Sequence, residues 1–230
     1  MDLRIQDVAK LLRVSETTVK RWLSLGKIPS YRLDHQYRFS RTEIEDWVLS
    51  NHDSHLFESD TCNEPLGPQA YGLYRSLHKG AFLKDVPGKE KEAVIRESVA
   101  VMAETLVLDA NVLTDLLLDR ERLMPTSLGC GIAVPHTRDF LFPGASDFVS
   151  VVYLKDPIEY GALDGKKVHT LFFLFACEDK THLHLLAKLA HFVNSEQNRE
   201  FLAGRPEKKE LLQYVKLWEE GKSPVAAVAQ

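Results

Sequence analysis

The 230-residue chain contains little cysteine and no long apolar segment. Its three cysteines, Cys62, Cys130 and Cys177, are an odd and sparse set, which excludes a disulfide framework and indicates a reducing compartment. The longest apolar run, Leu171–Cys177, is far shorter than the roughly 20 residues that a membrane-spanning helix needs. The first residues lack the apolar region of a signal peptide. We therefore expect a cytoplasmic protein without a membrane-inserted segment.

The chain also lacks an excess of positive charge. Its formal net charge is −4, so contact with a nucleic acid would have to be local. Residues 1–50 hold nine Lys and Arg against seven Asp and Glu, and the remainder holds 20 against 26. The length allows one large or two ordinary domains, and the two parts differ in electrostatic character.

The first 24 residues predict two short helices joined by a tight turn. Apolar residues recur at helical spacing over Ile5–Leu12. Ser15 is a good N-cap for a second helix, on which Val19 and Trp22 share an apolar face. This arrangement is typical of a helix-turn-helix unit. On the second helix, Thr17, Lys20 and Arg21 point away from Trp22, and Thr18 lies at the edge of the apolar face. These four residues are candidates for contact with DNA bases or phosphates.

The next residues predict a hairpin and a third helix. Two short extended segments, Ile28–Leu33 and Tyr37–Phe39, flank a turn at Asp34–Gln36 and form a wing. Ser40 and Glu43 form a capping box that starts the third helix. The predicted order is helix, turn, helix, wing, helix.

Six short segments of residues 1–50 carry a family pattern: Asp7–Leu12, Val14–Ser15, Thr18–Trp22, Gly26–Pro29, Tyr37–Phe39 and Glu45–Trp47. With them, this part of the chain resembles the excisionase/MerR-type winged helix-turn-helix family. The resemblance implies DNA binding, with Lys20 and Arg21 on the recognition helix and Arg32 and Arg38 on the wing. The wing tip is usually basic in that family, whereas here it is Asp34–Gln36, and the charge excess is small. A helical module that contacts protein is the alternative.

Residues 51–70 have the composition of a linker, rich in Asp, Ser, Asn, Pro and Gly and without periodicity. They separate a domain at 1–50 from a second domain at 71–220, which is followed by a tail at 221–230. His52, His55 and Cys62 do not have the spacing of a zinc site, so we assign no metal, and we expect no cofactor.

The second domain alternates helices with buried strands, which predicts an α/β layered fold. Helices are expected at 89–105 and 110–119, the second capped by Asp109, and near 208–218, with a further helix capped by Thr181. Strands are expected at 148–153 and 168–175. Because Pro135 biases Val134 toward an extended conformation, His136 should stand at the end of a short strand.

Matching segments extend through this domain: Arg120–Glu121, Thr126, Gly129–His136, Pro157–Ile158, Leu163–Gly165, Val168 and Thr181–His184. With them, residues 71–217 resemble the enzyme IIA component of the phosphoenolpyruvate-dependent phosphotransferase system, of the fructose/mannitol and nitrogen-regulatory class. The resemblance implies a three-layer domain with a mixed sheet, in which His136 accepts a phosphoryl group from an HPr-like phosphocarrier protein. It gives Arg120 and His182 as the residues that contact the phosphoryl group. Thr126, Gly129 and Gly131 would support the loop, the glycines by allowing close backbone approach.

The chemistry of these residue types agrees with that role. An imidazole must be neutral to act as a nucleophile, and an ordinary histidine is mostly neutral at pH 7. Arg120 would offer a planar, permanently charged fork to phosphoryl oxygens. The chain departs from the family at Cys130, where Asn is frequent, at Thr137, where Gly is frequent, and in Met124–Ser127, where the usual glycines are missing.

Three functions follow as hypotheses. The first is a nitrogen-regulatory type protein in which phosphorylation of His136 is coupled to DNA binding. The second is a non-catalytic DNA-binding transcriptional regulator whose second domain serves only for sensing or for docking. The third is a sugar-specific phosphocarrier. The sequence leaves the oligomeric state, including a homodimer, open.

Overall fold

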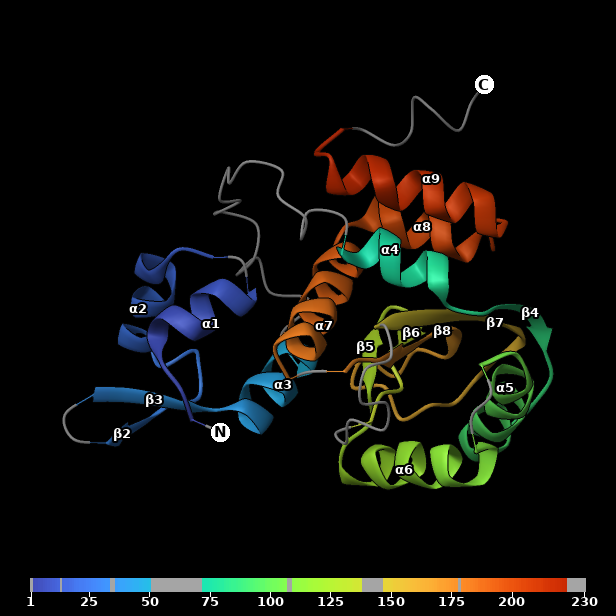
Figure 1. Cartoon of the computed structure of the whole chain (residues 1–230), viewed down its shortest axis with the longest axis horizontal. Helices are drawn as coiled ribbons and strands as arrows, with labels where there is room; N and C mark the ends of the chain where they lie inside the picture. The colour runs from blue at the N-terminus through green and yellow to red at the C-terminus, as the bar shows by residue number, and fades with distance from the viewer. Residues whose placement is uncertain are drawn as a thin grey trace.

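In the computed structural model, the described residues are 2–12, 14–33, 36–50, 72–106, 109–137, 147–177 and 179–222. They form a small N-terminal unit of helices with a hairpin and a larger unit with a central sheet, and the two lie against each other (Figure 1). The predicted linker, with His52, His55 and Cys62, lies outside these residues, so the predicted domain boundaries stay predictions.

The N-terminal unit has the predicted winged helix-turn-helix order. Its elements are β1 (Asp2–Leu3), α1 (Ile5–Leu12), α2 (Glu16–Ser24), β2 (Tyr31–Leu33), β3 (Gln36–Ser40) and α3 (Arg41–Ser50). Ser15 caps α2, because its Oγ accepts a hydrogen bond from the Thr18 backbone N–H at 3.0 Å. Strands β2 and β3 pair antiparallel as the wing, and β1, which was not predicted, adds to the other edge of β3.

The second unit contains a five-stranded mixed sheet. Its elements are α4 (Gly72–Lys79), β4 (Phe82–Val86), α5 (Lys91–Leu106), α6 (Ala110–Leu123), β5 (Ser127–Gly129), β6 (Ile132–Ala133), β7 (Phe148–Ile158), β8 (Val168–Phe175), α7 (Asp179–Asn194), α8 (Glu196–Ala203) and α9 (Lys208–Glu219). The strand order is β4-β7-β8-β6-β5. The β4–β7 and β6–β8 pairs are parallel, whereas the β7–β8 and β5–β6 pairs are antiparallel.

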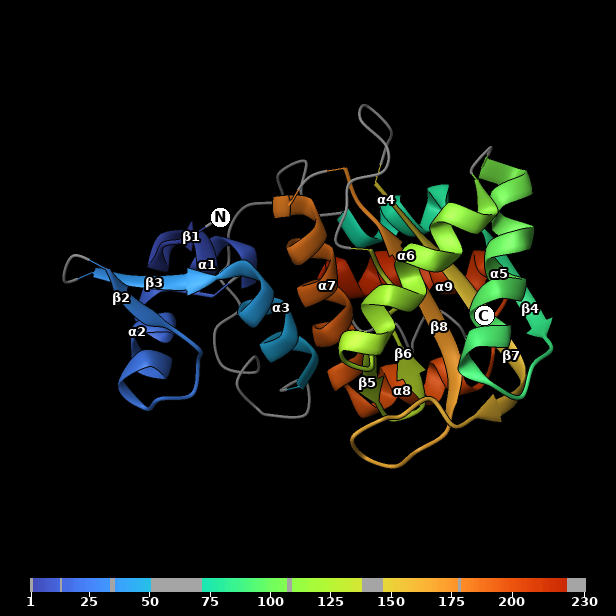
Figure 2. The same cartoon turned by 90° about the horizontal axis from the view of Figure 1, so that it is seen from below.

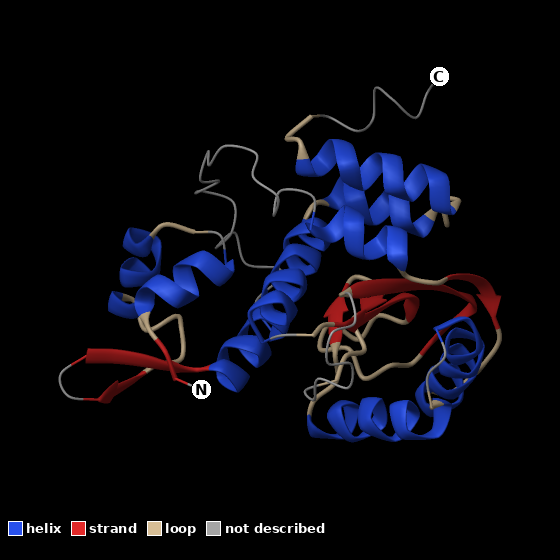
Figure 3. Ribbon diagram, viewed as in Figure 1, coloured by secondary structure: helices blue, strands red, loops and turns tan. Residues whose placement is uncertain are grey.

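Helices cover both faces of this sheet, as the three-layer prediction requires. Helices α5 and α6 lie on one face, and α4, α7, α8 and α9 lie on the other (Figures 1 and 3). Alternating side chains of β8 serve the two faces: Phe172 and Leu174 join the core under α7, whereas Leu171 and Phe173 join the core under α5 and α6. All four are fully buried, so a continuous apolar strand was the correct prediction.

Several predicted boundaries were wrong. Helix α6 keeps its predicted Asp109 cap but continues to Leu123, so Arg120 lies in its last turn and not after it. Helix α7 begins at Asp179, so Thr181 does not cap it. Strand β7 extends to Ile158, and α4, β4 and α8 were not predicted. The hydrophobic periodicity of the sequence is weak in short elements and at the ends of helices and strands. Tertiary packing decides where these elements begin and end.

The N-terminal unit shares its core with the larger unit. Helices α1 and α3 both contact α7, and α3 also contacts the edge strand β5 (Figure 2). Apolar residues of α1, α2 and α3 belong to the same buried cluster as those of α7 and one face of the sheet. This packing places α3 directly beside the loop that carries His136. Within the described part of the chain, no helix is both long and apolar enough to cross a membrane.

Candidate functional site

His136 stands just beyond β6, at the end of an extended segment that lies beside β8. Its backbone bridges to Leu174, whose N–H donates to Pro135 O at 2.9 Å. The ring is fully buried, and its Nδ1 lies 2.7 Å from Val134 O. Because a carbonyl oxygen only accepts hydrogen bonds, Nδ1 carries a hydrogen and Nε2 is the nitrogen left for chemistry.

Arg120 reaches His136 from the last turn of α6. Its Nε lies 3.2 Å from His136 Nε2, and Nη1 donates to Met124 O at 3.1 Å. Met124 lies in the segment where the chain departs from the family, but the contact uses only its backbone carbonyl. The guanidinium is nearly fully buried and keeps its charge under all ordinary conditions. A fixed cation beside Nε2 suits an anionic group at that nitrogen.

His182 lies in the first turn of α7, with its ring centre 5.1 Å from that of His136. Burial, reinforced by the positive charges of His136, Arg41 and Arg120 and opposed by Glu45, lowers the pKa of His182 to about 3. The ring is therefore neutral at pH 7. Its Nδ1 lies 3.1 Å from Arg41 Nη2, and its buried Nε2 has no hydrogen-bond partner among the described residues. His184, by contrast, faces the start of α4 beside Gly72.

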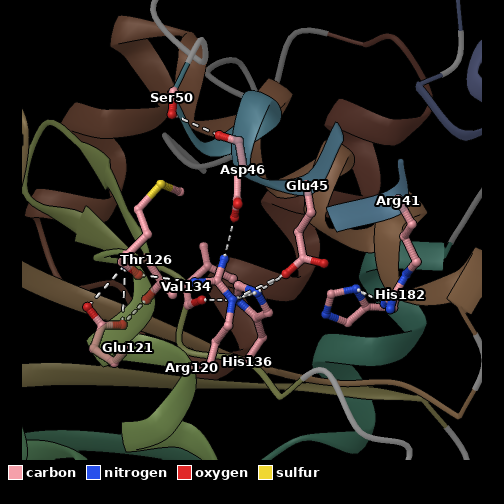
Figure 4. Close-up of polar contacts among 11 residues, drawn as sticks. Arg41, Glu45, Asp46, Ser50, Arg120, Glu121, Thr126, Val134, His136 and His182 are labelled. Carbon is pink, nitrogen blue, oxygen red and sulfur yellow. Dashed lines mark hydrogen bonds and ion pairs between the residues drawn. The ribbon is translucent and has the colours of Figure 1, made fainter. Parts of the chain in front are cut away.

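Three further residues complete the site, and all three come from α3 of the N-terminal unit (Figure 4). Glu45 Oε1 lies 2.6 Å from His136 Nε2 and 3.4 Å from Arg120 Nε. Asp46 Oδ1 accepts from Arg120 Nη2 at 3.0 Å. Arg41 pairs with His182 as described above. The site is thus assembled from both units of the chain.

Glu45 is the most deeply buried acid of this group, at 0 % exposure. Burial alone raises its pKa, but the hydrogen bond to His136 and the electrostatic attraction of His136 and Arg120 outweigh burial and leave the pKa well below its usual range. The carboxylate is therefore ionised. Its second oxygen, Oε2, has no hydrogen-bond partner within the described ranges.

No pattern in the sequence marks these α3 residues directly as site residues. Glu45 and Asp46 had been matched only to the winged helix-turn-helix pattern. One signal was available: Leu49 follows Glu45 by four residues and lies on the same side of α3, outside the predicted face of Ile44, Trp47 and Val48. Leu49 is buried, so α3 has a second covered face.

The loop before His136 is held by Glu121, which the resemblance had matched without a role. Thr126 donates from its backbone N–H to Glu121 Oε1 at 3.1 Å and from Oγ1 to Oε2 at 2.6 Å. Burial raises the pKa of Glu121, and the bonds from Thr126 and the charge of Lys91 oppose that rise. Val134 N–H in turn donates to Thr126 O at 2.9 Å. Thr126 thus links α6 to the strand that ends in His136.

The turn at Gly129–Gly131 needs unusual backbone conformations. Gly129, Cys130 and Gly131 have φ of 73°, 50° and 82°. A Cβ at Gly131 would lie 2.4 Å from His169 Cδ2, so close approach as well as positive φ requires glycine there. Cys130 adopts a left-handed conformation that asparagine tolerates better, which explains the family preference at that position.

The predicted DNA contacts divide into two groups. Thr17, Lys20 and Arg21 of α2 are exposed, whereas Thr18 is buried with its Oγ1 2.9 Å from Ser15 Oγ. The expectation that Thr18 faces DNA therefore lacks support, since a residue at the edge of the apolar face turned inward. On the wing, Arg32 stacks over Tyr37 at 5.0 Å, and Arg38 donates to Gln36 Oε1 at 3.0 Å.

Glu45, His136 and His182 also form a possible metal-ligand set, because one ligand atom from each lies within 4.8 Å of the others. A carboxylate with two imidazoles suits Zn²⁺. However, Arg120 Nε lies 3.4 Å from Glu45 Oε1 and 3.2 Å from His136 Nε2. This fixed positive charge opposes a dication at the same place, so the arrangement favours an anion over a metal.

Comparison with known proteins gives the same division of the chain. Residues 76–217 match the family described as phosphoenolpyruvate-dependent sugar phosphotransferase system, EIIA 2, and residues 3–52 match a helix-turn-helix domain family. The nitrogen regulatory protein of Pseudomonas aeruginosa is 35% identical over 146 residues, which cover 62% of this chain and 94% of that protein. The fructose-specific EIIABC component of Bacillus subtilis is 33% identical over 131 residues, 55% of this chain and 20% of that protein. The crystal structure of the nitrogen regulatory protein IIA-Ntr from Neisseria meningitidis superimposes with a TM-score of 0.52 at 26% identity and covers 57% of this chain and 90% of that chain.

Proposed function

Because the chain belongs to the EIIA 2 family of the phosphoenolpyruvate-dependent sugar phosphotransferase system, we propose that it accepts a phosphoryl group on His136 from an HPr-like phosphocarrier protein. The observation that carries the proposal is the pairing of Arg120 Nε with His136 Nε2 at 3.2 Å, while Val134 O fixes Nδ1. The helix-turn-helix domain makes the proposed output regulation of DNA binding.

The transfer step uses the lone pair of Nε2. Hydrogen bonding of Nδ1–H to Val134 O orients the ring with Nε2 facing Arg120. As the new P–N bond forms on Nε2, the P–N bond of the carrier's phosphohistidine breaks and its electron pair returns to the carrier's imidazole. Little covalent chemistry falls to the surrounding groups, so position and charge dominate the rate.

Arg120 and His182 have complementary roles in this step. Arg120 neutralises charge on the phosphoryl oxygens with a permanent cation. His182 is neutral, because its pKa is about 3, and it can donate one hydrogen bond to a phosphoryl oxygen without adding charge. Its unpartnered Nε2 is the atom available for that bond.

Labelling with a phosphoenolpyruvate-driven carrier cascade tests the proposal. We expect acid-labile label on the wild type and none on His136→Gln, because the substitution removes the nucleophilic nitrogen. His78→Gln, which changes an exposed histidine on α4, is the matched control and should label as the wild type does. Label that persists undiminished on His136→Gln would place the phosphoryl group on another residue and contradict the proposal.

The nitrogen-regulatory type is favoured over a sugar-specific phosphocarrier by the comparison with relatives. The match covers 94% of the nitrogen regulatory protein but 20% of the fructose-specific component. The sugar-specific reading is the second candidate. It requires the phosphoryl group to pass from His136 to a transporter component, whereas a regulator retains it until the carrier takes it back.

We further propose that the N-terminal unit binds DNA through α2 and the wing. Lys20 and Arg21 are exposed on α2, and α2 and the wing lie at the end of the molecule remote from the larger unit (Figure 1). Arg32 is exposed on the wing. The charge available for phosphate contact is nevertheless small, so base contacts and a second copy of the domain on the DNA would have to contribute.

Gel-shift titration with a duplex selected from a random pool tests the DNA proposal. The double variant Lys20→Ala/Arg21→Ala should bind more weakly and lower the salt slope, log K against log salt, by about two, since each lost phosphate contact contributes about 0.9. Lys209→Ala/Lys216→Ala, which removes two exposed lysines from α9, is the charge-matched control. No enrichment of any duplex, or equal affinity of the double variant and the control, would contradict DNA binding.

A further inference from the structure

Helix α3 occupies the site that the proposed function assigns to the phosphoryl group. Glu45 Oε1 lies 2.6 Å from His136 Nε2 and 3.4 Å from Arg120 Nε. These are the nucleophile and the cation that a phosphoryl group on His136 would contact. A carboxylate and a phosphoryl group both present anionic oxygens that accept charge-assisted hydrogen bonds. Glu45 therefore places an anion of the chain itself at this subsite.

The contact also covers the nitrogen that the transfer needs. Nδ1 carries a hydrogen because Val134 O can only accept, so Nε2 is the nitrogen left for a P–N bond. Glu45 Oε1 lies 2.6 Å from Nε2, and Arg120 Nε–H donates to the same atom at 3.2 Å. In the docked arrangement the nucleophilic atom of His136 is therefore closed to a phosphoryl donor.

The other site residues are engaged by α3 in the same way. Asp46 Oδ1 accepts from Arg120 Nη2 at 3.0 Å, and Arg41 Nη2 lies 3.1 Å from His182 Nδ1. Leu49 and Met124 line one small hollow beside these contacts. Each of the three residues predicted for phosphoryl transfer thus has a partner on α3 (Figure 4). This match is more specific than burial of an apolar helix face would require.

We propose that docking of α3 and phosphorylation of His136 exclude each other, with Glu45 holding the phosphoryl subsite of the unmodified protein. The inference rests on the proposed function and adds its regulation. Donor access requires α3 to withdraw, and a phosphoryl group on Nε2 then prevents its return, because Glu45 would meet an anion where it now meets the His136 ring nitrogen and the Arg120 cation.

Phosphoryl transfer from the docked form begins with withdrawal of α3. The withdrawal removes Glu45 from Nε2 and leaves the ring with Nδ1–H on Val134 O and a free lone pair on Nε2. The freed lone pair forms the P–N bond while the donor's bond to phosphorus breaks and its electron pair leaves with the donor. No oxidant, reductant or metal is needed.

Phosphorylation would change the position of the N-terminal unit relative to the larger unit, and not the exposure of its DNA-binding residues. Thr17, Lys20 and Arg21 are already exposed in the docked form. What phosphorylation alters is the attachment of α3 to the larger unit, whose residues 72–222 hold 22 acids against 20 bases, a small excess of negative charge. Release would move this negative charge away from DNA bound at α2, so the phosphorylated form should bind DNA more tightly at low salt.

The rate of phosphorylation by phosphoramidate, a small phosphoryl donor, tests the exclusion without the carrier. If the open form is about 0.1–10% populated, Glu45→Ala should react about 10- to 1,000-fold faster than wild type. Glu45→Gln, which keeps the size but not the charge, should fall between them. Glu43→Ala, an exposed acid on the same helix, is the matched control and should react at the wild-type rate.

The pattern of outcomes separates the inference from the proposed function. Faster phosphoramidate labelling of Glu45→Ala, with no labelling of any form by the carrier cascade, would support the exclusion and contradict the carrier. Equal phosphoramidate rates for wild type and Glu45→Ala would overturn the exclusion whatever the cascade does. Failure of phosphoramidate to label Glu45→Ala, together with cascade labelling of the wild type on His136, would overturn the exclusion and leave the proposed function standing.

Hydrogen exchange of the wild type gives a second test that needs no substitution. Amide exchange in α3, residues 41–50, should be faster when His136 carries a phosphoryl group than when it does not. Exchange in α9, which is remote from the site, should not change. Unaltered protection of α3 in fully phosphorylated protein would overturn the exclusion.

Discussion

Replacing Arg120 by alanine is expected to lower the rate of phosphoryl transfer to His136 by about two to three orders of magnitude. A single preorganised donor at a developing charge is worth about that much, and an arginine at a transferring phosphoryl group at least as much. Arg120 is buried with its Nε 3.2 Å from His136 Nε2, so water cannot replace it without reorganisation.

The measurement is best made in a Glu45→Ala background with the carrier cascade. Arg120 also forms ion pairs with Glu45 and Asp46. In the wild-type background its removal would therefore have two effects together, a weaker attachment of α3 and a slower transfer step. With Glu45 absent, Nε2 is uncovered, and adding Asp46→Ala to the background removes the remaining contact of Arg120 with α3, so the difference reports the chemistry alone. Arg120→Lys should recover part of the rate, because it restores charge without the planar fork. Arg122→Ala, an exposed arginine on the same helix that pairs with Asp119, is the control. A loss of less than threefold for Arg120→Ala would refute the assigned role.

Acidification is expected to destabilise the folded chain through His182, by about 2 kcal/mol between pH 7.5 and pH 5. The pKa of His182 is about 3 in the fold, against about 6.5 in an unfolded chain. As the pH falls below about 6.5, the unfolded chain therefore binds a proton that the folded chain does not, and the free energy of unfolding falls by about 1.4 kcal/mol per pH unit. The loss of stability is complete only when the pH falls to the pKa of His182 in the folded chain.

Urea denaturation of wild type and His182→Gln at pH 7.5, 6 and 5 measures this contribution. The variant should show a flatter dependence on pH, while His78→Gln should follow the wild type. Glu45 acts in a lower range, because its depressed pKa makes its contribution fall only below about pH 4.5. Glu121 has a raised pKa and the opposite sign, but it is present in both proteins and cancels in the comparison. Parallel pH profiles for wild type and His182→Gln would show that the ring is not held neutral.

Much of the fold could be predicted from the sequence because its signals are local. The continuous apolar run at 168–175 became β8 at its predicted bounds, and Asp109 and Ser15 cap the helices that they were expected to cap. The conformation of the segment from Gly129 to His136 could also be predicted. Positive φ and close backbone approach need glycine, and Pro135 favours an extended backbone before His136. Thr181 does not cap α7, because the helix begins two residues earlier, at Asp179, and helix ends are set less sharply by local sequence than helix interiors.

The candidate site was only half predictable. His136, Arg120 and His182 could be placed by resemblance, although they are spread over 62 positions of the chain, and the structure brings them together. Arg41, Glu45 and Asp46 could not, because their partners lie 74 to 141 residues away and across the predicted linker. Apolar residues at helical spacing indicate that a face of α3 is buried, but they do not indicate which part of the chain packs against it.

The sequence by itself determined the two families, the loop that ends in His136 and the residue types that would handle a phosphoryl group, since these depend on short-range backbone chemistry and on side-chain identity. Only the tertiary structure decided that an acid from the winged helix-turn-helix unit sits on the nucleophile. That contact is between two folded surfaces, and its strength comes from the attraction of opposite charges in a buried site, which no local pattern of residues encodes.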